Sequence, residues 1–106
     1  MGHQAQIMAA LDLNINEVAA LFGVSRYTAA QWLERGVPSD RQAKMATVAA
    51  VCDLLERKLK PGRVPGIARR PARVYGGRSL LQVIADDEHE WLLASVRDSF
   101  ELANGP

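Results

Sequence analysis

The sequence has few of the residues from which metal and redox sites are built. Its 106 residues include one cysteine, Cys52, and two histidines, His3 and His89. A single cysteine excludes an intramolecular disulfide and a cysteine-cluster zinc site, and two histidines are too few to replace it. His89 lies between two glutamates with no nucleophile implied nearby, which is typical of a charged helix surface. We therefore expect no metal, no cofactor, no small-molecule substrate and no catalytic residue, so the protein is not expected to be an enzyme.

Long apolar runs and strand-like patterns are also missing. No segment approaches the roughly 18 consecutive apolar residues of a membrane span, and the N-terminus lacks a basic stretch followed by an apolar core. Valine, isoleucine and threonine never alternate with polar residues over the length of a strand, whereas alanine and leucine are abundant. The sequence therefore predicts a cytoplasmic, all-α protein without a membrane partner. A hydrophobic fraction of 48% is enough for an ordinary folded core.

The formal net charge of +1 conceals a strong asymmetry along the chain. Residues 1–38 sum to −1, residues 39–79 to +7 and residues 80–106 to −5. Eight basic residues and no acidic residue lie between Arg57 and Arg78. Such segregation is typical of chains with two kinds of partner.

Capping signals divide the first part of the chain into four helices. Asn14 with Glu17 forms a capping box before a second helix, and Ser25 caps a third, which Gly36 ends in a left-handed conformation. Ser39, paired with Gln42, is expected to start a long central helix. The expected helices cover residues 3–13, 15–22, 26–34 and 39–60. The central helix is expected to bury a broad face made of Ala43, Ala46, Val48, Ala49, Val51, Cys52, Leu55 and Leu59.

The remainder divides into a connector and two C-terminal helices. Residues 61–78, rich in proline, glycine and arginine, are expected to lack regular structure. Ser79 caps a short helix that reaches Ile84. A last helix is expected to bury Trp91, Leu92, Ser95, Val96 and Phe100. The predicted architecture is a compact helical bundle, with a DNA-binding region over residues 1–60, the basic connector, and a partner-binding region over residues 79–106.

Residues 15–34 meet the demands of a helix-turn-helix at several positions at once. Ala19 is small where the second helix crosses the first, and Gly23 accepts positive φ in the turn. Five further apolar residues supply the contacts between the two helices: Val18, Phe22, Val24, Ala29 and Trp32. The segment 14–25, Asn-Ile-Asn-Glu-Val-Ala-Ala-Leu-Phe-Gly-Val-Ser, resembles the repressor-type helix-turn-helix of Xre-like bacterial and phage regulators.

The Xre-like resemblance implies that the third helix enters the major groove of double-stranded DNA. Arg26, Tyr27, Ala30 and Gln31 then read base edges, with Arg26 suited to guanine and Gln31 to adenine. Ser25 and Thr28 contact phosphate. A regulator of this kind would be associated with the nucleoid. A homodimer on an inverted repeat is favoured, because a single short helix rarely gives enough affinity for DNA.

The segment 69–84, Arg-Arg-Pro-Ala-Arg-Val-Tyr-Gly-Gly-Arg-Ser-Leu-Leu-Gln-Val-Ile, supports a second resemblance. It is similar to the toxin-binding domain of MbcA/ParS-type antitoxins, in which a loop leads to Gly-Arg-Ser/Thr and a short apolar helix. The resemblance implies a cognate protein toxin of the ADP-ribosyltransferase-like, NAD-consuming kind. Arginines would suit a site that receives the phosphates of NAD, and the candidates for partner or phosphate contact are Arg69, Arg70, Arg73 and Arg78.

The residues leave other interpretations open. The near-neutral charge of residues 1–38 is compatible with a bundle that only packs or binds protein, and the basic segment with a solvated linker. The protein is best read as an autoregulating antitoxin and repressor. The alternatives are a phage or prophage repressor, whose C-terminal part dimerises or binds DNA, and an adaptor without a nucleic-acid role.

Overall fold

The computed structural model describes residues 2–60 and 62–103, and every regular element in that part of the chain is a helix. The predicted all-α class is therefore confirmed. In chain order the elements are α1 (His3–Leu11), α2 (Ile15–Phe22), α3 (Arg26–Arg35), α4 (Ser39–Lys58), α5 (Val64–Arg69), the single-turn 3₁₀ helix η1 (Arg73–Tyr75), α6 (Leu80–Ala85) and α7 (His89–Ala103).

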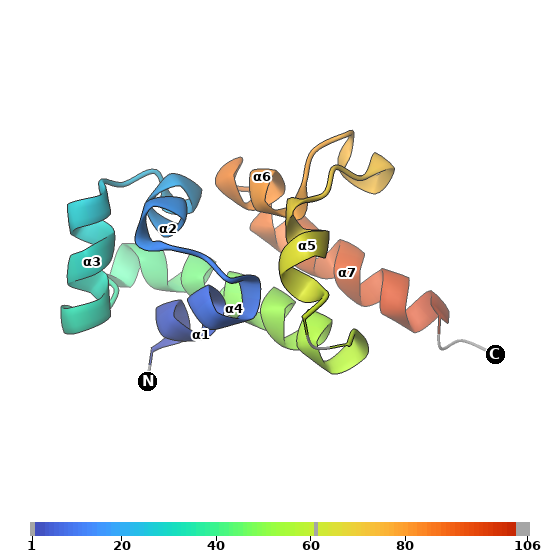
Figure 1. The fold of residues 1–106 in the computed structure, drawn as a ribbon, viewed down its shortest axis with the longest axis horizontal. Helices are drawn as coiled ribbons and strands as arrows, with labels where there is room; N and C mark the ends of the chain where they lie inside the picture. Colours follow the sequence, from blue (N-terminus) through green and yellow to red (C-terminus); the bar gives the residue numbers. More distant parts are fainter. Residues whose placement is uncertain (1, 61, 104–106) are drawn as a thin grey trace.

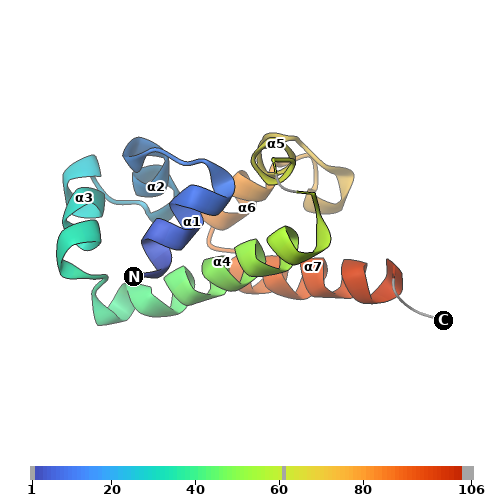
Figure 2. The ribbon, with the colours of Figure 1, turned by 60° about the horizontal axis from the view of Figure 1, so that its bottom comes forward.

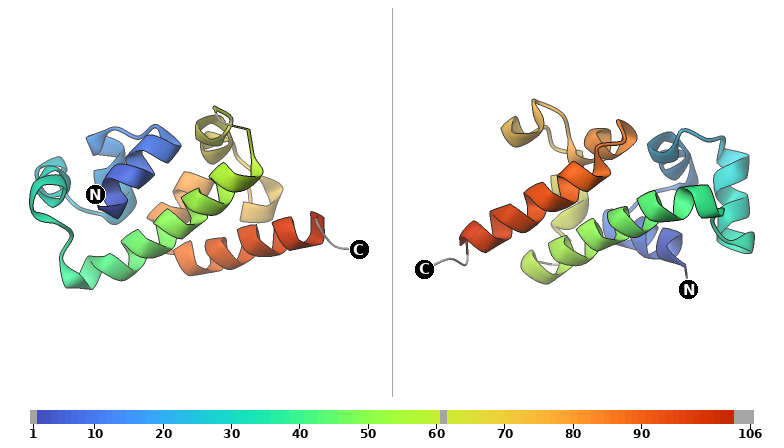
Figure 3. Two further views of the ribbon diagram at one scale, coloured as in Figure 1. Left: turned by 90° about the horizontal axis from the view of Figure 1, so that it is seen from below. Right: turned by 180° about the vertical axis from the view of Figure 1, so that it is seen from behind.

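The long helix α4 is the spine of the molecule (Figure 1). Helix α1 crosses one side of it, α7 runs beside it, and α2 and α3 pair beyond its N-terminal half (Figure 2). Helices α5 and α6 fill the space between α1, α2 and α7. Views from below and behind show α4 and α7 side by side (Figure 3). The two ends of the chain therefore share one hydrophobic core rather than forming two separate ones.

The N-terminal helices begin where the sequence predicts. The amide of Glu17 donates to the Asn14 side chain at 2.8 Å while the Glu17 carboxylate accepts from the Asn14 amide at 3.0 Å, which completes the capping box. Ser25 accepts from the amide of Thr28 at 3.1 Å and so caps α3. Gly23 ends α2 at φ 65°, a left-handed conformation that a residue with a Cβ rarely adopts. Both caps join residues three positions apart, which a single helical turn brings together.

Three boundary predictions are wrong. Asp12 adopts φ 52° and ends α1 at Leu11, and Leu59 is extended, so α4 ends at Lys58. Helix α3 runs to Arg35, one residue beyond the prediction, and Gly36 follows it with φ 92° and ψ 164°, a positive φ but not the left-handed helical conformation. The Gly36 amide nevertheless donates to the Trp32 carbonyl at 2.9 Å and closes the last turn of α3.

The predicted capping box at the start of α4 does not form. Pro38 is the N-cap, so Ser39 already lies inside the helix, where its hydroxyl makes no capping bond. The Gln42 side chain donates instead to the carbonyl of Val37 at 3.0 Å. Proline supplies the extended backbone that precedes a helix, and this displaced the start by one residue.

The buried face of α4 is narrower than predicted. Its core residues are Met45, Val48, Ala49, Val51, Cys52 and Leu55. Ala43 and Ala46, expected in the core, are exposed, and Leu59 is half-buried. Alanine satisfies a helical pattern whether it faces the core or solvent, so its position in the sequence does not decide its burial.

Residues 62–78 are folded, although no regular structure was expected between residues 61 and 78. Val64 and Ala68 of α5 are buried, and Pro65 lies in its first turn, where the missing amide proton costs no helical bond. Helix α5 packs on α1 and α6. The basic connector is thus part of the packed structure over its described residues.

The C-terminal helices form where predicted, but only two of the five residues predicted to be buried in the last helix are buried. Ser79 and Gln82 form the capping box of α6, with the Ser79 amide donating to the Gln82 side chain at 2.7 Å. In α7, Leu92 and Val96 are buried, and Ser95 and Phe100 are partly buried. Trp91, predicted in the core, is 44% exposed. It precedes Leu92 by one residue, which turns it about 100° away from the face that packs on α4.

Candidate nucleic-acid interface and partner surface

Helix α3 is held by its inner face. Ala29 and Trp32 are buried, and the Trp32 ring meets Phe22 of α2 edge to face, with centroids 5.9 Å apart. The buried Gln4 side chain of α1 donates to the Ala29 carbonyl at 2.9 Å. Ala19 is buried and Val24 partly buried in the same region. These contacts leave one orientation for α3 and turn its other face outward.

The predicted DNA-reading residues lie together on that outer face. Arg26, Tyr27 and Ala30 are exposed, Tyr27 to 70%, and Gln31 is half-buried. The Gln31 Nε2 donates to the Tyr27 hydroxyl at 3.1 Å across one helical turn. Ser25 and Thr28 lie at the N-terminal end of α3, where their hydroxyls are 3.0 Å apart. The structure thus gathers all six residues at one surface.

Two cationic side chains of α4 bind the C-terminal end of α2, which was not predicted from the sequence. Arg41 donates to the Phe22 carbonyl and Lys44 to the Leu21 carbonyl, both at 2.6 Å. They bind carbonyl groups that a helix C-terminus leaves without an intrahelical partner. The Lys44 Nζ also lies 4.9 Å from the centroid of the Phe22 ring. In the sequence, Lys44 stands out only as a cation that interrupts the apolar pattern of α4. The carbonyl that it binds is 23 residues away, so the pattern does not reveal the contact.

The four candidate arginines differ in what they contact. Arg69 donates to the carbonyls of Leu11 at 2.8 Å and Asp12 at 2.7 Å, and pairs with Glu17 at 3.3 Å. It therefore ties α5 to the turn between α1 and α2. Arg70 and Arg73 are exposed on the surface.

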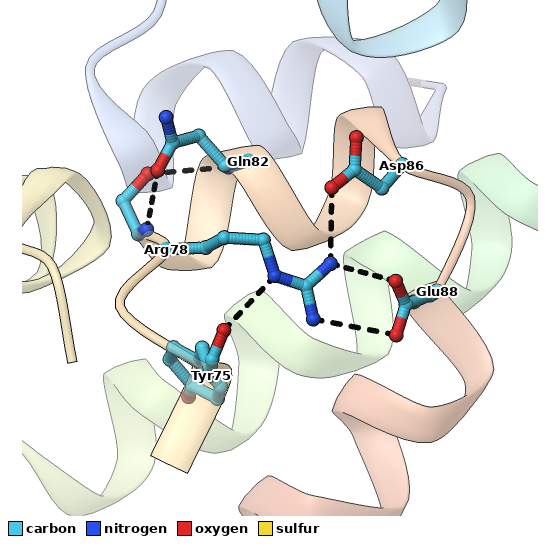
Figure 4. Close-up of polar contacts among 6 residues, drawn as sticks. Tyr75, Arg78, Gln82, Asp86 and Glu88 are labelled. Carbon is cyan, nitrogen blue, oxygen red and sulfur yellow. Dashed lines mark hydrogen bonds and ion pairs between the residues drawn. The ribbon is translucent and has the colours of Figure 1, made fainter. Parts of the chain in front are cut away.

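Arg78 holds the loop before α6 against the turn after it (Figure 4). Its guanidinium donates to the Tyr75 carbonyl at 2.9 Å, to Asp86 at 3.0 Å and to Glu88 at 2.6 Å. The hydrogen bonds that Arg78 donates to Glu88 and Asp86 raise its pKa, and its charge is in any case permanent. The sequence predicted a partner contact for Arg78, whereas its geometry is that of an internal clasp.

An exposed apolar surface lies beside this clasp. Tyr75 and Trp91 meet edge to face with ring centroids 6.0 Å apart, and Val74, next to Tyr75, is 58% exposed. Burial raises the pKa of the Tyr75 phenol. Because the clasp fixes Tyr75, the surface made by Val74, Tyr75 and Trp91 is preformed. Sequence analysis missed it because Trp91 fitted a core position equally well.

The described residues offer no centre for metal chemistry. Across residues 2–60 and 62–103, no three His, Cys, Asp or Glu side chains gather in a metal-binding arrangement. Burial, with Glu56 adding to it, raises the pKa of the Cys52 thiol to about 12, so the thiol stays protonated in the core. None of the helices in these ranges has the length and apolarity required to span a bilayer.

The arrangement of helices is a fold that a solved toxin–antitoxin complex also contains. The crystal structure of the M. tuberculosis MbcT–MbcA toxin–antitoxin complex contains a chain that matches with a TM-score of 0.72. The match covers 90% of this chain and 87% of that chain, at 22% sequence identity. No family model and no curated protein sequence matches the chain.

Proposed function

We propose that this protein is a non-enzymatic antitoxin that binds double-stranded DNA through α3 and a cognate protein toxin through its C-terminal part. The observation that carries the proposal is the fold, whose likeness to a chain of a toxin–antitoxin complex extends over 90% of the sequence. Because only about a tenth of the sequence lies outside the likeness, neither the N-terminal nor the C-terminal half of the chain can be missing from it.

The DNA-binding half rests on the exposed polar face of α3. We infer that α2 and α3 act as a helix-turn-helix and that Arg26 and Gln31 contact base edges, while Ser25 and Thr28 approach phosphate. Arg26 and Tyr27 project from the first turn of a helix whose inner side is held by Ala29. A rigid helix of this kind can present its N-terminal residues to a groove without an ordering cost.

Only some of the candidate arginines are available to a binding partner, because the others make contacts within the protein. Arg69 and Arg78 already bind carbonyls and carboxylates within the protein, which leaves Arg70 and Arg73 for phosphate or partner contact. If both bind phosphate, replacing them lowers the slope of log affinity against log salt by about two units. If they bind the toxin, the slope is unchanged and toxin affinity falls.

The toxin-binding half rests on the surface made by Val74, Tyr75 and Trp91. Exposed tryptophan, tyrosine and arginine are the residues that most often dominate protein interfaces. The Arg78 clasp holds the Tyr75 backbone, the Tyr75 ring meets the Trp91 ring edge to face, and Arg70 and Arg73 precede them in the chain. We propose that this surface docks the toxin, an ADP-ribosyltransferase-like enzyme that consumes NAD, and that the arginines approach its phosphate-binding site.

Fluorescence anisotropy across a salt series tests the DNA half. A labelled fragment from upstream of the coding sequence is compared with a scrambled fragment of equal length. We expect a preference of about a thousandfold at physiological salt, and Arg26→Ala or Gln31→Ala to cost about 1–3 kcal/mol each. Equal, weak binding to both fragments would contradict DNA regulation and leave a protein-interaction module.

Co-expression tests the toxin half. The protein encoded by the adjacent gene is produced with the wild-type chain, with Trp91→Ala and with Leu33→Ala, a matched control at an exposed apolar residue on α3. We expect the wild-type chain and Leu33→Ala to restore growth and form a stable complex, and Trp91→Ala to weaken both. An adjacent gene for an integrase, with no toxic product, would favour a phage repressor instead.

A further inference from the structure

We propose that Tyr27 sets the base preference of α3 by orienting the Gln31 carboxamide to read the adenine of an A·T base pair. This inference rests on the proposed DNA-binding function and assigns Tyr27 a positioning role rather than a general contact. Tyr27 and Gln31 are four residues apart and therefore share a face of the helix. That face is the outer one, because Ala29 and Trp32 take up the inner one.

The hydrogen bond between the two side chains restricts Gln31. One N–H of its Nε2 donates to the Tyr27 hydroxyl at 3.1 Å. A glutamine side chain has three rotatable bonds, and an exposed one samples many orientations at a cost of up to about 2 kcal/mol when it is fixed on binding. Tyr27 reduces that cost before DNA arrives. The backbone beneath is itself fixed by the Gln4 bond to the Ala29 carbonyl.

The orientation leaves a defined pair of groups for recognition. The second N–H and the Oε1 of Gln31 remain available side by side, one donor and one acceptor. Adenine presents the complementary pair in the major groove, an acceptor at N7 and a donor at N6. Guanine presents two acceptors, which would require Gln31 to turn two donors outward and so give up its donation to Tyr27. The observed bond therefore favours adenine over guanine.

A shallow hollow beside the pair suits the other half of the base pair. It has a volume of about 190 Å³ and is lined by Tyr27, Ala30, Gln31, Glu34 and Arg35. Among its lining residues, Ala30 contributes a methyl group and Tyr27 an aromatic ring. Thymine is the base that places a methyl group in the major groove. We infer that this hollow accepts the thymine methyl while Gln31 binds the adenine.

The test begins with an operator selected from a random DNA pool by the wild-type protein. At each A·T pair of that operator, affinity is measured after replacement by G·C, by 7-deazaadenine, which lacks N7, and by uracil, which lacks the methyl. We expect one pair at which all three replacements weaken wild-type binding. At that pair Tyr27→Phe lowers the preference for A·T over G·C about three- to tenfold, the value of one hydrogen bond.

A double-mutant cycle separates positioning from direct contact. Tyr27→Phe is expected to have no further effect on base preference in a Gln31→Ala background, because the group it positions is gone. Gln6→Ala removes another exposed contact between side chains of one helix, that of Gln6 with His3 in α1, and is the control, expected to leave base preference unchanged. Circular dichroism melting establishes that each variant is folded.

The outcomes distinguish the two proposals. If Gln31→Ala relaxes the preference and Tyr27→Phe does not, the positioning role is overturned while the DNA-binding function stands. Equal weakening on every sequence by Tyr27→Phe would also overturn it, by making Tyr27 a general contact. If the base pair whose recognition depends on Gln31 is G·C, the adenine assignment is overturned. If the wild-type protein selects no sequence from the pool, the proposed function fails with it.

Discussion

The ammonium group of Lys44 lies 2.7 Å from the carboxylate of Asp87, and this ion pair joins α4 to the C-terminal part of the chain. The same ammonium donates to the last turn of α2, and Asp87 belongs to the turn between α6 and α7. The Lys44 side chain is 11% exposed, whereas Asp87 is largely exposed. One buried cation on α4 thus connects the proposed DNA-binding helices to the proposed partner-binding helices.

Asp87→Asn is expected to lower stability at neutral pH and to have no effect in strong acid. The hydrogen bond and charge of Lys44 lower the pKa of Asp87 below its ordinary value of 3.8. The ion pair therefore adds its full stability above the ordinary pKa of the unfolded chain. This stability is lost as the pH falls through the lowered pKa of the folded protein. Asparagine keeps the shape and tolerates the φ of 61° at this position. Urea unfolding at pH 7 and pH 2.5 measures the difference; an equal loss at both would contradict a charge effect.

His89→Gln is expected to remove part of the stability loss between pH 7.5 and pH 5.5. Burial and then the positive charge of Lys44 lower the pKa of His89 below 6.5, while Asp87 and Glu90 oppose this. Its Nδ1 is buried without a partner among the described residues. The unfolded chain therefore takes up the proton first, so stability falls as the pH drops below about 6.5. Thermal melts of both proteins across this range measure the slope, and parallel curves would contradict the assignment.

Arg69→Ala is expected to destabilise the fold by about 1–3 kcal/mol, because it removes charge-assisted bonds to the Leu11 and Asp12 carbonyls. Arg69→Lys rescues little, since a single ammonium cannot reproduce the fork of the guanidinium. Arg70→Ala is the matched control and is expected to change the unfolding free energy by less than about 0.5 kcal/mol. Denaturant titration compares the three, and equal effects of the two alanine variants would contradict the structural role of Arg69.

Leu92→Ala is expected to cost about 2–5 kcal/mol, because Leu92 is fully buried in the core that α7 shares with α4. Leu33→Ala makes the same change at a residue that is 47% exposed and is expected to stay within about 0.5 kcal/mol of the wild type. Thermal and urea unfolding measure both. Similar midpoints for the two variants would show that α7 does not pack as described.

Cys52 is expected to resist thiol reagents until the protein unfolds. Its side chain is 1% exposed, and burial raises its pKa to about 12, so almost no thiolate exists at pH 8. Labelling with a chromogenic disulfide is expected to be negligible in buffer and complete in guanidinium chloride. Fast labelling of the native protein would indicate that α4 opens readily.

Local sequence determined the elements whose signals span three or four residues. The caps at Asn14, Ser25 and Ser79 and the left-handed Gly23 were all predictable, because each depends on a hydrogen bond or a dihedral angle within one turn. The gathering of Arg26, Tyr27, Ala30 and Gln31 on one surface followed from the same helical periodicity.

Tertiary contacts decided the rest, since composition carries no record of which distant group a side chain meets. Residues 61–78 suggested a linker, yet Arg69 reaches carbonyls 57 and 58 residues away and α5 folds against α1. Arg70 and Arg69 are neighbours of one type in the sequence, but only Arg69 binds those carbonyls. Trp91 and Leu92 fitted the core equally well until α4 fixed which face of α7 is inward. The sequence by itself determined where most helices begin and what chemistry they carry; the packing around α4 decided which of those groups remain available to a partner.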